Sequence, residues 1–172
     1  MAHLVGFTNA CLPEQGRLLE VLARGRGGGW IGETGTGCGV GLAWMASAAG
    51  AATRLVSIER DPRLAVAASE VFRERSNVTV LRGDWTAIAS WAPFDLLVLD
   101  AGAKVDARLD PADLLAPRAG LVIDDFTPSD DWPPRFGGEV DRDRMHWFEH
   151  PRLLTTELRL TETAASLVAI RR

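Results

Sequence analysis

The sequence has no tyrosine, a single lysine and only two cysteines, Cys11 and Cys38. The two cysteines do not have the spacing of a metal or redox site, so we expect a reduced, cytoplasmic setting. Positive charge is not in excess either, because the formal net charge is −4. Nucleic-acid-binding surfaces are usually strongly basic, and we therefore expect no nucleic-acid partner.

Long apolar segments are also missing. No apolar run reaches the length that spans a membrane, so we expect no membrane partner. The stretch MAHLVGFTNACLPEQG lacks the basic start and apolar block of a signal peptide. With 172 residues, 47% of them hydrophobic and 24% charged, the chain has the size and balance of one domain. We predict a single domain over 1–172, with an N-terminal helical segment at 1–28 and the core at 29–172.

Apolar runs and helical patterns alternate along the chain. Continuous apolar runs predict buried strands at 30–33, 53–59, 78–84, 94–100 and 120–125. Helical patterns occupy 13–25, 40–50 and 61–76, with shorter ones at 85–92 and 111–117. Strands that are apolar throughout are typical of a parallel sheet covered by helices. The order predicts an α/β fold, a Rossmann-like doubly wound, mostly parallel sheet with helices on both faces.

The end of the chain departs from this alternation. Residues 153–160 and 165–172 are rich in β-forming residues and are joined by the polar link TETA, with no helix between them. We therefore predict a C-terminal antiparallel hairpin. The irregular stretch TPSDDWPPRFGGEVDRD could form a loop over the site, where Trp132 and the later Trp147 could line an aromatic substrate pocket.

The most informative stretch is WIGETGTGCGVGLAWMA, residues 30–46, with glycine at positions 35, 37, 39 and 41. A glycine turn between a strand and a helix lets a ligand approach the backbone at a helix N-terminus. The spacing is not G-x-G-x-x-G, and no phosphate loop of the G-x-x-x-x-G-K-[ST] type is present. What remains is E-x-G-x-G-x-G, with a second acid, Glu59, closing the next strand. A carboxylate there can bind both ribose hydroxyls of a nucleoside.

These features resemble the class I S-adenosylmethionine-dependent methyltransferases, and within them the small-molecule O-methyltransferases of the catechol and caffeoyl-coenzyme A type. The opening helix LPEQGRLLEVLAR, the turn ETGTGCG, the strand FDLLVLDA and the strand GLVIDDF match family landmarks in the same order. The resemblance covers nearly the whole chain, up to the closing hairpin. It implies S-adenosylmethionine as cofactor, a small-molecule acceptor and a homodimer.

The resemblance also implies cofactor roles for individual residues. Glu33, Gly35, Gly37 and Gly39 would line the methionine part, and Glu59 would hold the ribose. Asp84 would accept a hydrogen bond from the adenine amino group, with Trp85 and Asp100 beside the cofactor. Two alternatives stay open: Glu59 could be an ordinary acid at a strand end, and Asp84 could be a helix N-cap.

Three further carboxylates close the fourth and fifth strands. Asp100, Asp124 and Asp125 should converge at the ligand crevice, where they would repel one another without a cation. Oxygen ligands of this kind suit Mg²⁺ or a similar divalent ion, and in the resembling family this is the metal site. There the metal binds two adjacent hydroxyls of the acceptor and lowers their pKa. The alternative is that one aspartate caps a turn while the other pairs with an arginine.

The sequence departs from the family pattern at several of these positions. Asp125 stands where the family has asparagine, and Gly41 replaces a serine. The lysine that acts as the base in the family would fall at Ala103, whereas the only lysine of this chain, Lys104, is one residue further along. Asp100 and Lys104 are nevertheless the candidate catalytic residues. Trp85 occupies a position where a small residue is usual.

The sequence therefore predicts a methyltransferase acting on an oxygen of a small molecule, with assistance by a divalent metal as one hypothesis. Three alternatives stay open. The same fold could methylate nitrogen or carbon without metal; the protein could be another nucleoside-binding enzyme, such as an aminopropyltransferase or a nicotinamide enzyme; or it could be a non-catalytic scaffold.

Overall fold

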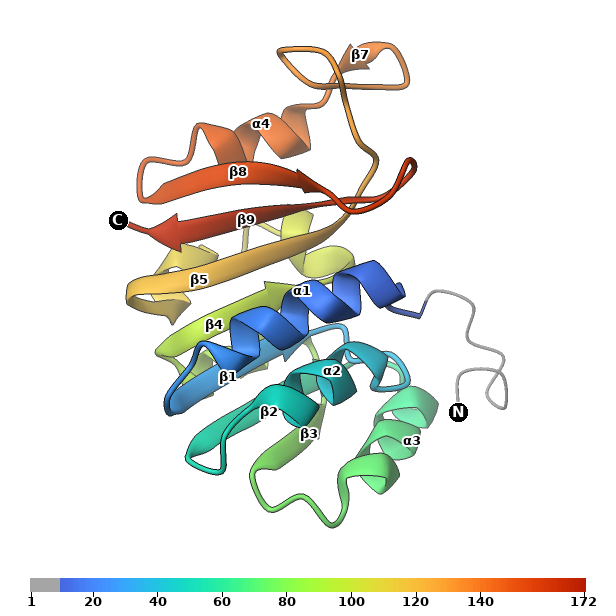
Figure 1. The fold of residues 1–172 in the computed structure, drawn as a ribbon, viewed down its shortest axis with the longest axis vertical. Helices are drawn as coiled ribbons and strands as arrows, with labels where there is room; N and C mark the ends of the chain where they lie inside the picture. Colours follow the sequence, from blue (N-terminus) through green and yellow to red (C-terminus); the bar gives the residue numbers. More distant parts are fainter. Residues whose placement is uncertain (1–9) are drawn as a thin grey trace.

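The computed structural model describes residues 10–172, so residues 1–9 of the predicted N-terminal segment lie outside the described part. Its centre is a seven-stranded sheet with the order β3-β2-β1-β4-β5-β9-β8 (Figure 1). The first five strands pair in parallel. Their bounds are Gly29–Thr34 (β1), Thr53–Glu59 (β2), Val78–Arg82 (β3), Phe94–Leu99 (β4) and Leu115–Phe126 (β5). The predicted mostly parallel α/β sheet is confirmed.

Three α-helices cover one face of this sheet: α1 (Pro13–Arg24), α2 (Val40–Ala48) and α3 (Pro62–Phe72) (Figure 1). The start of α3 follows from its sequence, because Asp61 accepts a hydrogen bond from the Arg63 amide and proline occupies the first turn. Between this face and the helices lies an apolar core cluster from both layers. It includes Leu19, Ile31, Leu42, Met45, Leu55, Leu96 and Val98.

The opposite face is covered by shorter elements. These are the 3-10 helices η2 (Trp85–Trp91), η3 (Ala101–Val105) and η4 (Pro111–Leu114), and the helix α4 (Arg142–Phe148). A second apolar cluster, including Phe94, Leu97, Leu99, Leu121 and Trp147, lies under them. The helical turn predicted at 111–117 ends early, because Leu115 pairs with Phe94 and already belongs to β5.

The C-terminal hairpin is confirmed. Its strands are β8 (Leu153–Arg159) and β9 (Ala165–Arg171), and β9 inserts antiparallel between β5 and β8. The irregular stretch before α4 contains only a small ribbon of β6 (Arg135–Phe136) and β7 (Glu139–Val140). Among the helices of residues 10–172, none combines the length and apolar character needed to cross a bilayer.

An ion-pair network around one fully buried arginine attaches α4 to the hairpin. The Arg144 guanidinium donates to Asp141 at 3.1 Å, to Glu157 of β8 at 2.7 Å and to the backbone carbonyl of Thr127 at 2.5 Å. The Arg144 side chain has no solvent exposure. Because all these partners are oxygen acceptors, removing the arginine would leave two mostly covered carboxylates without a counter-charge.

We expect Arg144→Met to lower the free energy of unfolding by about 3–5 kcal/mol, because it breaks this buried network from one side. Urea unfolding at neutral pH measures the change. The matched control is Arg159→Gln, whose ion pair with Asp130 is exposed and should contribute at most about 1 kcal/mol. Equal, small losses for the two variants would contradict a structural role for the Arg144 network.

Candidate functional site

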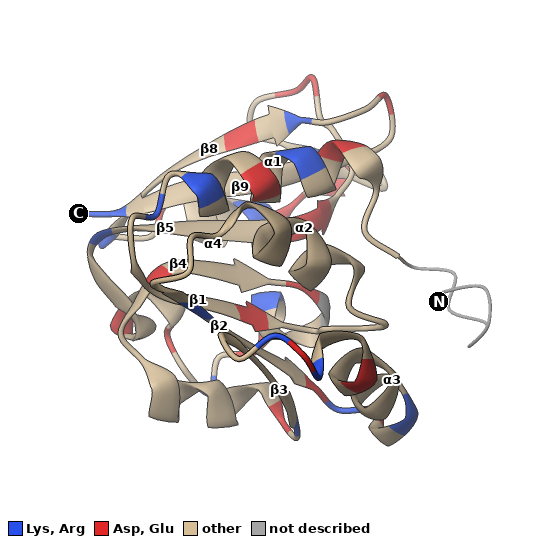
Figure 2. Cartoon of the chain, turned by 60° about the horizontal axis from the view of Figure 1, so that its bottom comes forward, with Lys and Arg blue, Asp and Glu red and all other residues tan. Residues whose placement is uncertain are grey.

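The acidic residues predicted from the sequence lie along the carboxyl edge of the parallel strands. Glu33 is in β1, Glu59 ends β2, Asp100 follows β4, and Asp124 and Asp125 lie near the end of β5. Figure 2 shows acidic segments in red at these strand ends. In a doubly wound sheet this edge opens into the ligand crevice. The parallel topology thus gathers acids that are far apart in the sequence.

The turn between β1 and α2 depends on glycine at alternate positions. The φ angle is 82° at Gly35, 55° at Gly37 and 86° at Gly39, in the left-handed region that side chains rarely adopt. Gly41 lies inside α2 and is needed for space, because a Cβ there would come within 2.7 Å of Oε1 of Glu33. The serine that the family carries at this position would therefore crowd the buried carboxyl.

The carboxylate of Glu59 holds this turn in place. Its Oε2 accepts a hydrogen bond from the backbone amide of Gly37, and its Oε1 accepts one from the amide of Asp61, each at 2.8 Å. Glu59 is therefore more than an acid at a strand end. Each of its oxygens keeps a second lone pair, which can accept a hydrogen bond from a ribose hydroxyl.

Glu33 is buried, with 4% of its surface exposed. One oxygen accepts a 2.5 Å hydrogen bond from the Ser57 hydroxyl, which itself lies 2.5 Å from the Thr36 hydroxyl in the glycine turn. The pKa of Glu33 is raised to about 8, mainly by burial and further by the negative charges of Asp100 and Glu59, while the Ser57 hydrogen bond opposes the shift. Glu33 therefore holds a proton at neutral pH in the absence of a ligand.

Three acids line one small hollow beside the turn. The hollow has a volume of about 30 Å³ and is bounded by Glu33, Asp100 and Asp124, with Cys11 and Gln15 on the α1 side. The pKa of the Cys11 thiol is raised to about 12 by burial and by the charges of Asp124, Glu33 and Asp100. Burial also raises the pKa of Asp124. Because none of the described residues lining the hollow is basic, it suits a small cationic group.

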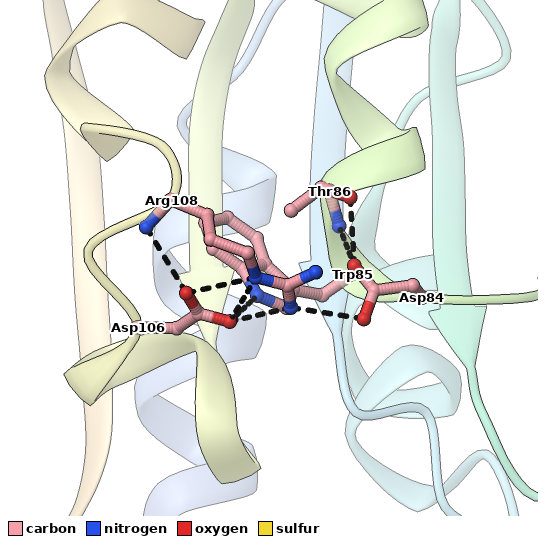
Figure 3. A network of polar contacts seen from close by, with 5 residues as sticks. All are labelled: Asp84, Trp85, Thr86, Asp106 and Arg108. Carbon is pink, nitrogen blue, oxygen red and sulfur yellow. Dashed lines mark hydrogen bonds and ion pairs between the residues drawn. The ribbon is translucent and has the colours of Figure 1, made fainter.

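Asp84 begins η2 as an N-cap, which is the alternative that the sequence left open. Its carboxylate accepts hydrogen bonds from the amide and hydroxyl of Thr86, at 3.0 and 2.7 Å, and from Arg108 at 2.9 Å (Figure 3). Arg108 also pairs with Asp106, which accepts a 2.8 Å hydrogen bond from the indole of Trp85. The hydrogen bonds from Arg108 and Thr86 lower the pKa of Asp84 to about 2.

A second hollow of about 170 Å³ lies on the other side of the turn. Glu59, Asp84 and Trp85 line it, and it shares Gly35 and Asp100 with the small acidic hollow. The two hollows therefore adjoin at the glycine turn. Together they offer a narrow acidic end and a wider end next to an indole ring.

The two neighbouring aspartates of β5 have different partners. Asp124 accepts a 2.8 Å hydrogen bond from Ser166, whereas the exposed carboxylate of Asp125 lies 3.5 Å from Nζ of Lys104. Within residues 10–172, no group of three or more His, Cys, Asp or Glu side chains is placed to hold a metal ion. The carboxylates that share a hollow are Glu33, Asp100 and Asp124, while Asp125 faces Lys104.

Sequence reasoning missed several polar residues of the site. Ser57 supports Glu33, and Ser166 of β9 contacts both Asp124 and the buried Gln15 of α1, at 2.8 and 2.7 Å. No motif marks these residues. The only signal is a serine next to apolar residues, as in LVSI and ASLVAI.

The raised pKa of Glu33 makes a specific pH prediction. Above its ordinary pKa of 4.5, the unfolded chain loses this proton while the folded chain keeps it up to about pH 8. Stability should therefore fall as pH rises through this window, by about 1.4 kcal/mol per pH unit. We expect the wild type to lose stability relative to Glu33→Gln, which has no proton to lose, in urea unfolding between pH 5 and pH 8. Parallel pH profiles for the two proteins would contradict the buried, protonated state of Glu33.

Comparison with known proteins identifies the family. Residues 33–126 match the family model of the methyltransferase domain. The fold is similar to that of cofactor-bound Rv0187 from MTB, with a TM-score of 0.79 and 25% sequence identity over 95% of this chain and 82% of that chain. It is also similar to the O-methyltransferase from Bacillus cereus in complex with SAH (TM-score 0.76, 20% identity, 99% and 86% covered).

A third similar structure is the O-methyltransferase TomG from Streptomyces achromogenes in complex with SAM (TM-score 0.74, 24% identity, 99% and 85% covered). No curated protein sequence gives a significant match to the chain. The matched segment includes more than half of the chain, from Glu33 in β1 to the end of β5. The resemblance drawn from the sequence is confirmed, and the chain belongs to the methyltransferase domain family.

Proposed function

We propose that this methyltransferase binds S-adenosylmethionine along the carboxyl edge of the sheet and transfers its methyl group to an oxygen of a small molecule. The amino-acid end of the cofactor would enter the small acidic hollow, and the ribose would bind Glu59. Adenine would lie in the wider hollow beside Asp84 and Trp85. The adjoining hollows at Gly35 and Asp100 support this placement.

The observation that carries the proposal is the trio of acids at the narrow end. S-adenosylmethionine has an ammonium, a sulfonium and one carboxylate, and Glu33, Asp100 and Asp124 would stabilise its net positive charge. The phosphates of a nicotinamide dinucleotide would instead meet these acids with like charge, and no glycine spacing or basic residue compensates for them there. The charge of the hollow therefore favours the sulfonium nucleoside over a phosphorylated cofactor.

The acceptor would lie in a third hollow, of about 220 Å³, which Lys104 lines. Val105, Phe126 and Phe136 give it an apolar wall, and its charged lining residues are Lys104, Arg144, Asp125, Asp141 and Asp143. In the reaction the acceptor oxygen forms a bond to the methyl carbon while the sulfur–carbon bond breaks and its electron pair returns to sulfur. Because the sulfonium is a good leaving group, alignment of the oxygen is the main task of the protein.

Several finer expectations from the sequence stay predictions. They are the roles of individual residues, assistance by a divalent metal, a homodimer and a cytoplasmic location. An oxygen acceptor is preferred to nitrogen or carbon because of the similarity to O-methyltransferases. If the chain were a non-catalytic scaffold, it could bind the cofactor but would transfer no methyl group to any acceptor.

Titration calorimetry with S-adenosylhomocysteine tests the proposal directly. We expect binding to the wild type, no binding of NAD, and an affinity about 10- to 100-fold lower for Glu59→Ala, because hydrogen bonds to a charged group contribute about 1.5–3 kcal/mol. Glu70→Ala is the matched control, since Glu70 is an exposed glutamate on α3. Preference for NAD, or an unchanged affinity in Glu59→Ala, would refute the assignment.

A further inference from the structure

The surroundings of Lys104, the single lysine of the chain, differ from those expected for a general base. Nζ of Lys104 donates hydrogen bonds to the backbone carbonyls of Asp124 and Asp125, each at 3.1 Å. It lies 3.5 Å from the Asp125 carboxylate and 5.5 Å from the centre of the Phe126 ring. Only 20% of the lysine side chain is exposed. The ammonium group is thus fixed at the carboxyl end of β5.

The one-residue shift of the lysine explains this position. Residues 101–105 form the 3-10 helix η3, in which consecutive residues point about 120° apart. Ala103, where the resembling family has its lysine, is 3% exposed and packs into the core. Lys104 therefore projects in another direction and reaches the end of the neighbouring strand.

The recorded partners of Lys104 are hydrogen-bond acceptors, a carboxylate and an aromatic ring. Two carbonyl oxygens, a carboxylate and an aromatic face all attract an ammonium, and none of them donates a hydrogen bond to a neutral amine. A divalent ion placed beside the Asp125 carboxylate would meet the like charge of the Lys104 ammonium, which already contacts this carboxylate and the carbonyls of Asp124 and Asp125. The absence of a suitable acidic cluster in the described part of the chain agrees with this.

We propose that the Lys104 ammonium takes the place of the divalent metal at this site and binds the acceptor oxygen as a fixed positive charge. This inference rests on the proposed methyl transfer. Two of the three ammonium protons are bonded to carbonyls, and the third, now 3.5 Å from the Asp125 carboxylate, would turn to the acceptor oxygen in the hollow that Lys104 and Asp125 both line. Lys104 is then a binding group for the oxygen and does not remove its proton.

The chemistry balances without a metal. The acceptor hydroxyl gives its proton to water, because the neighbouring ammonium stabilises the oxygen anion. The anion attacks the methyl carbon, the sulfur–carbon bond breaks, and neutral S-adenosylhomocysteine leaves. The negative charge of the oxygen and the positive charge of the sulfonium disappear together, while Lys104 stays protonated throughout.

The chain offers a direct readout, because ¹⁵N-labelled lysine reports on Lys104 alone. We expect the Nζ resonance of the full chain to be unchanged by millimolar Mg²⁺, with and without S-adenosylhomocysteine, and the melting temperature to be unchanged too. Displacement of the ammonium by Mg²⁺, seen as a shift of this resonance, or a rise in melting temperature with Mg²⁺, would overturn the proposal.

Turnover with 3,4-dihydroxybenzoate as probe acceptor provides the second test. EDTA should leave the rate of the wild type unchanged, and Lys104→Gln should lower kcat about 10²- to 10³-fold with the same affinity for S-adenosylhomocysteine. Lys104→Arg should restore part of the rate, since it restores the charge. Arg73→Gln, which removes an ion-paired cation on the distant surface of α3, is the matched control.

The two proposals fail in different ways. Loss of the rate in EDTA, or full activity of Lys104→Gln, would refute the role of Lys104 and leave methyl transfer intact. Failure of S-adenosylhomocysteine to bind would refute the proposed function, and the Mg²⁺ response of the Lys104 resonance would still decide whether a metal displaces the ammonium. A structural role alone would lower the melting temperature of Lys104→Gln without a specific loss in kcat.

Discussion

The hydrogen bonds between the Glu59 carboxylate and two backbone amides are the interaction on which the site depends. They join the end of β2 to the glycine turn that follows β1. They therefore restrain a segment in which three glycines have positive φ angles and the backbone is intrinsically flexible. The first turn of α2, the small acidic hollow and the wider hollow all border this turn. A ligand that also binds Glu59 is therefore held by a group that is already positioned.

The second constraint is the distribution of charge on the two sides of Asp100. Towards the glycine turn, the lining of the small hollow holds acids and no basic residue, and burial raises the pKa values of Glu33 and Asp124. Towards the acceptor hollow, the chain places its only lysine. A cationic methyl donor would meet acids on the glycine-turn side, and an anionic oxygen would meet the Lys104 ammonium on the other side.

The sequence predicted most of the fold, because its apolar runs and helix signals are local. The order of strands and helices, the C-terminal hairpin and the glycine turn can all be predicted from consecutive residues. The site is harder to predict, because its contacts join segments that are distant in the sequence. Asp84 was recognised as a candidate, but its partner Arg108 lies 24 residues away, and nothing local shows that the two meet. Likewise, the strand ends indicate that Asp100, Asp124 and Asp125 lie at one edge of the sheet, but they do not show that Asp124 contacts Ser166 and Asp125 contacts Lys104.

A crystal structure of the chain with S-adenosylhomocysteine bound tests the central claim most directly. The account predicts that both ribose hydroxyls lie within hydrogen-bond distance of the Glu59 carboxylate. It also predicts that the amino-acid end occupies the hollow bounded by Glu33, Asp100 and Asp124. A ligand bound away from the glycine turn, or a ribose held by other groups while Glu59 contacts only the backbone, would contradict it.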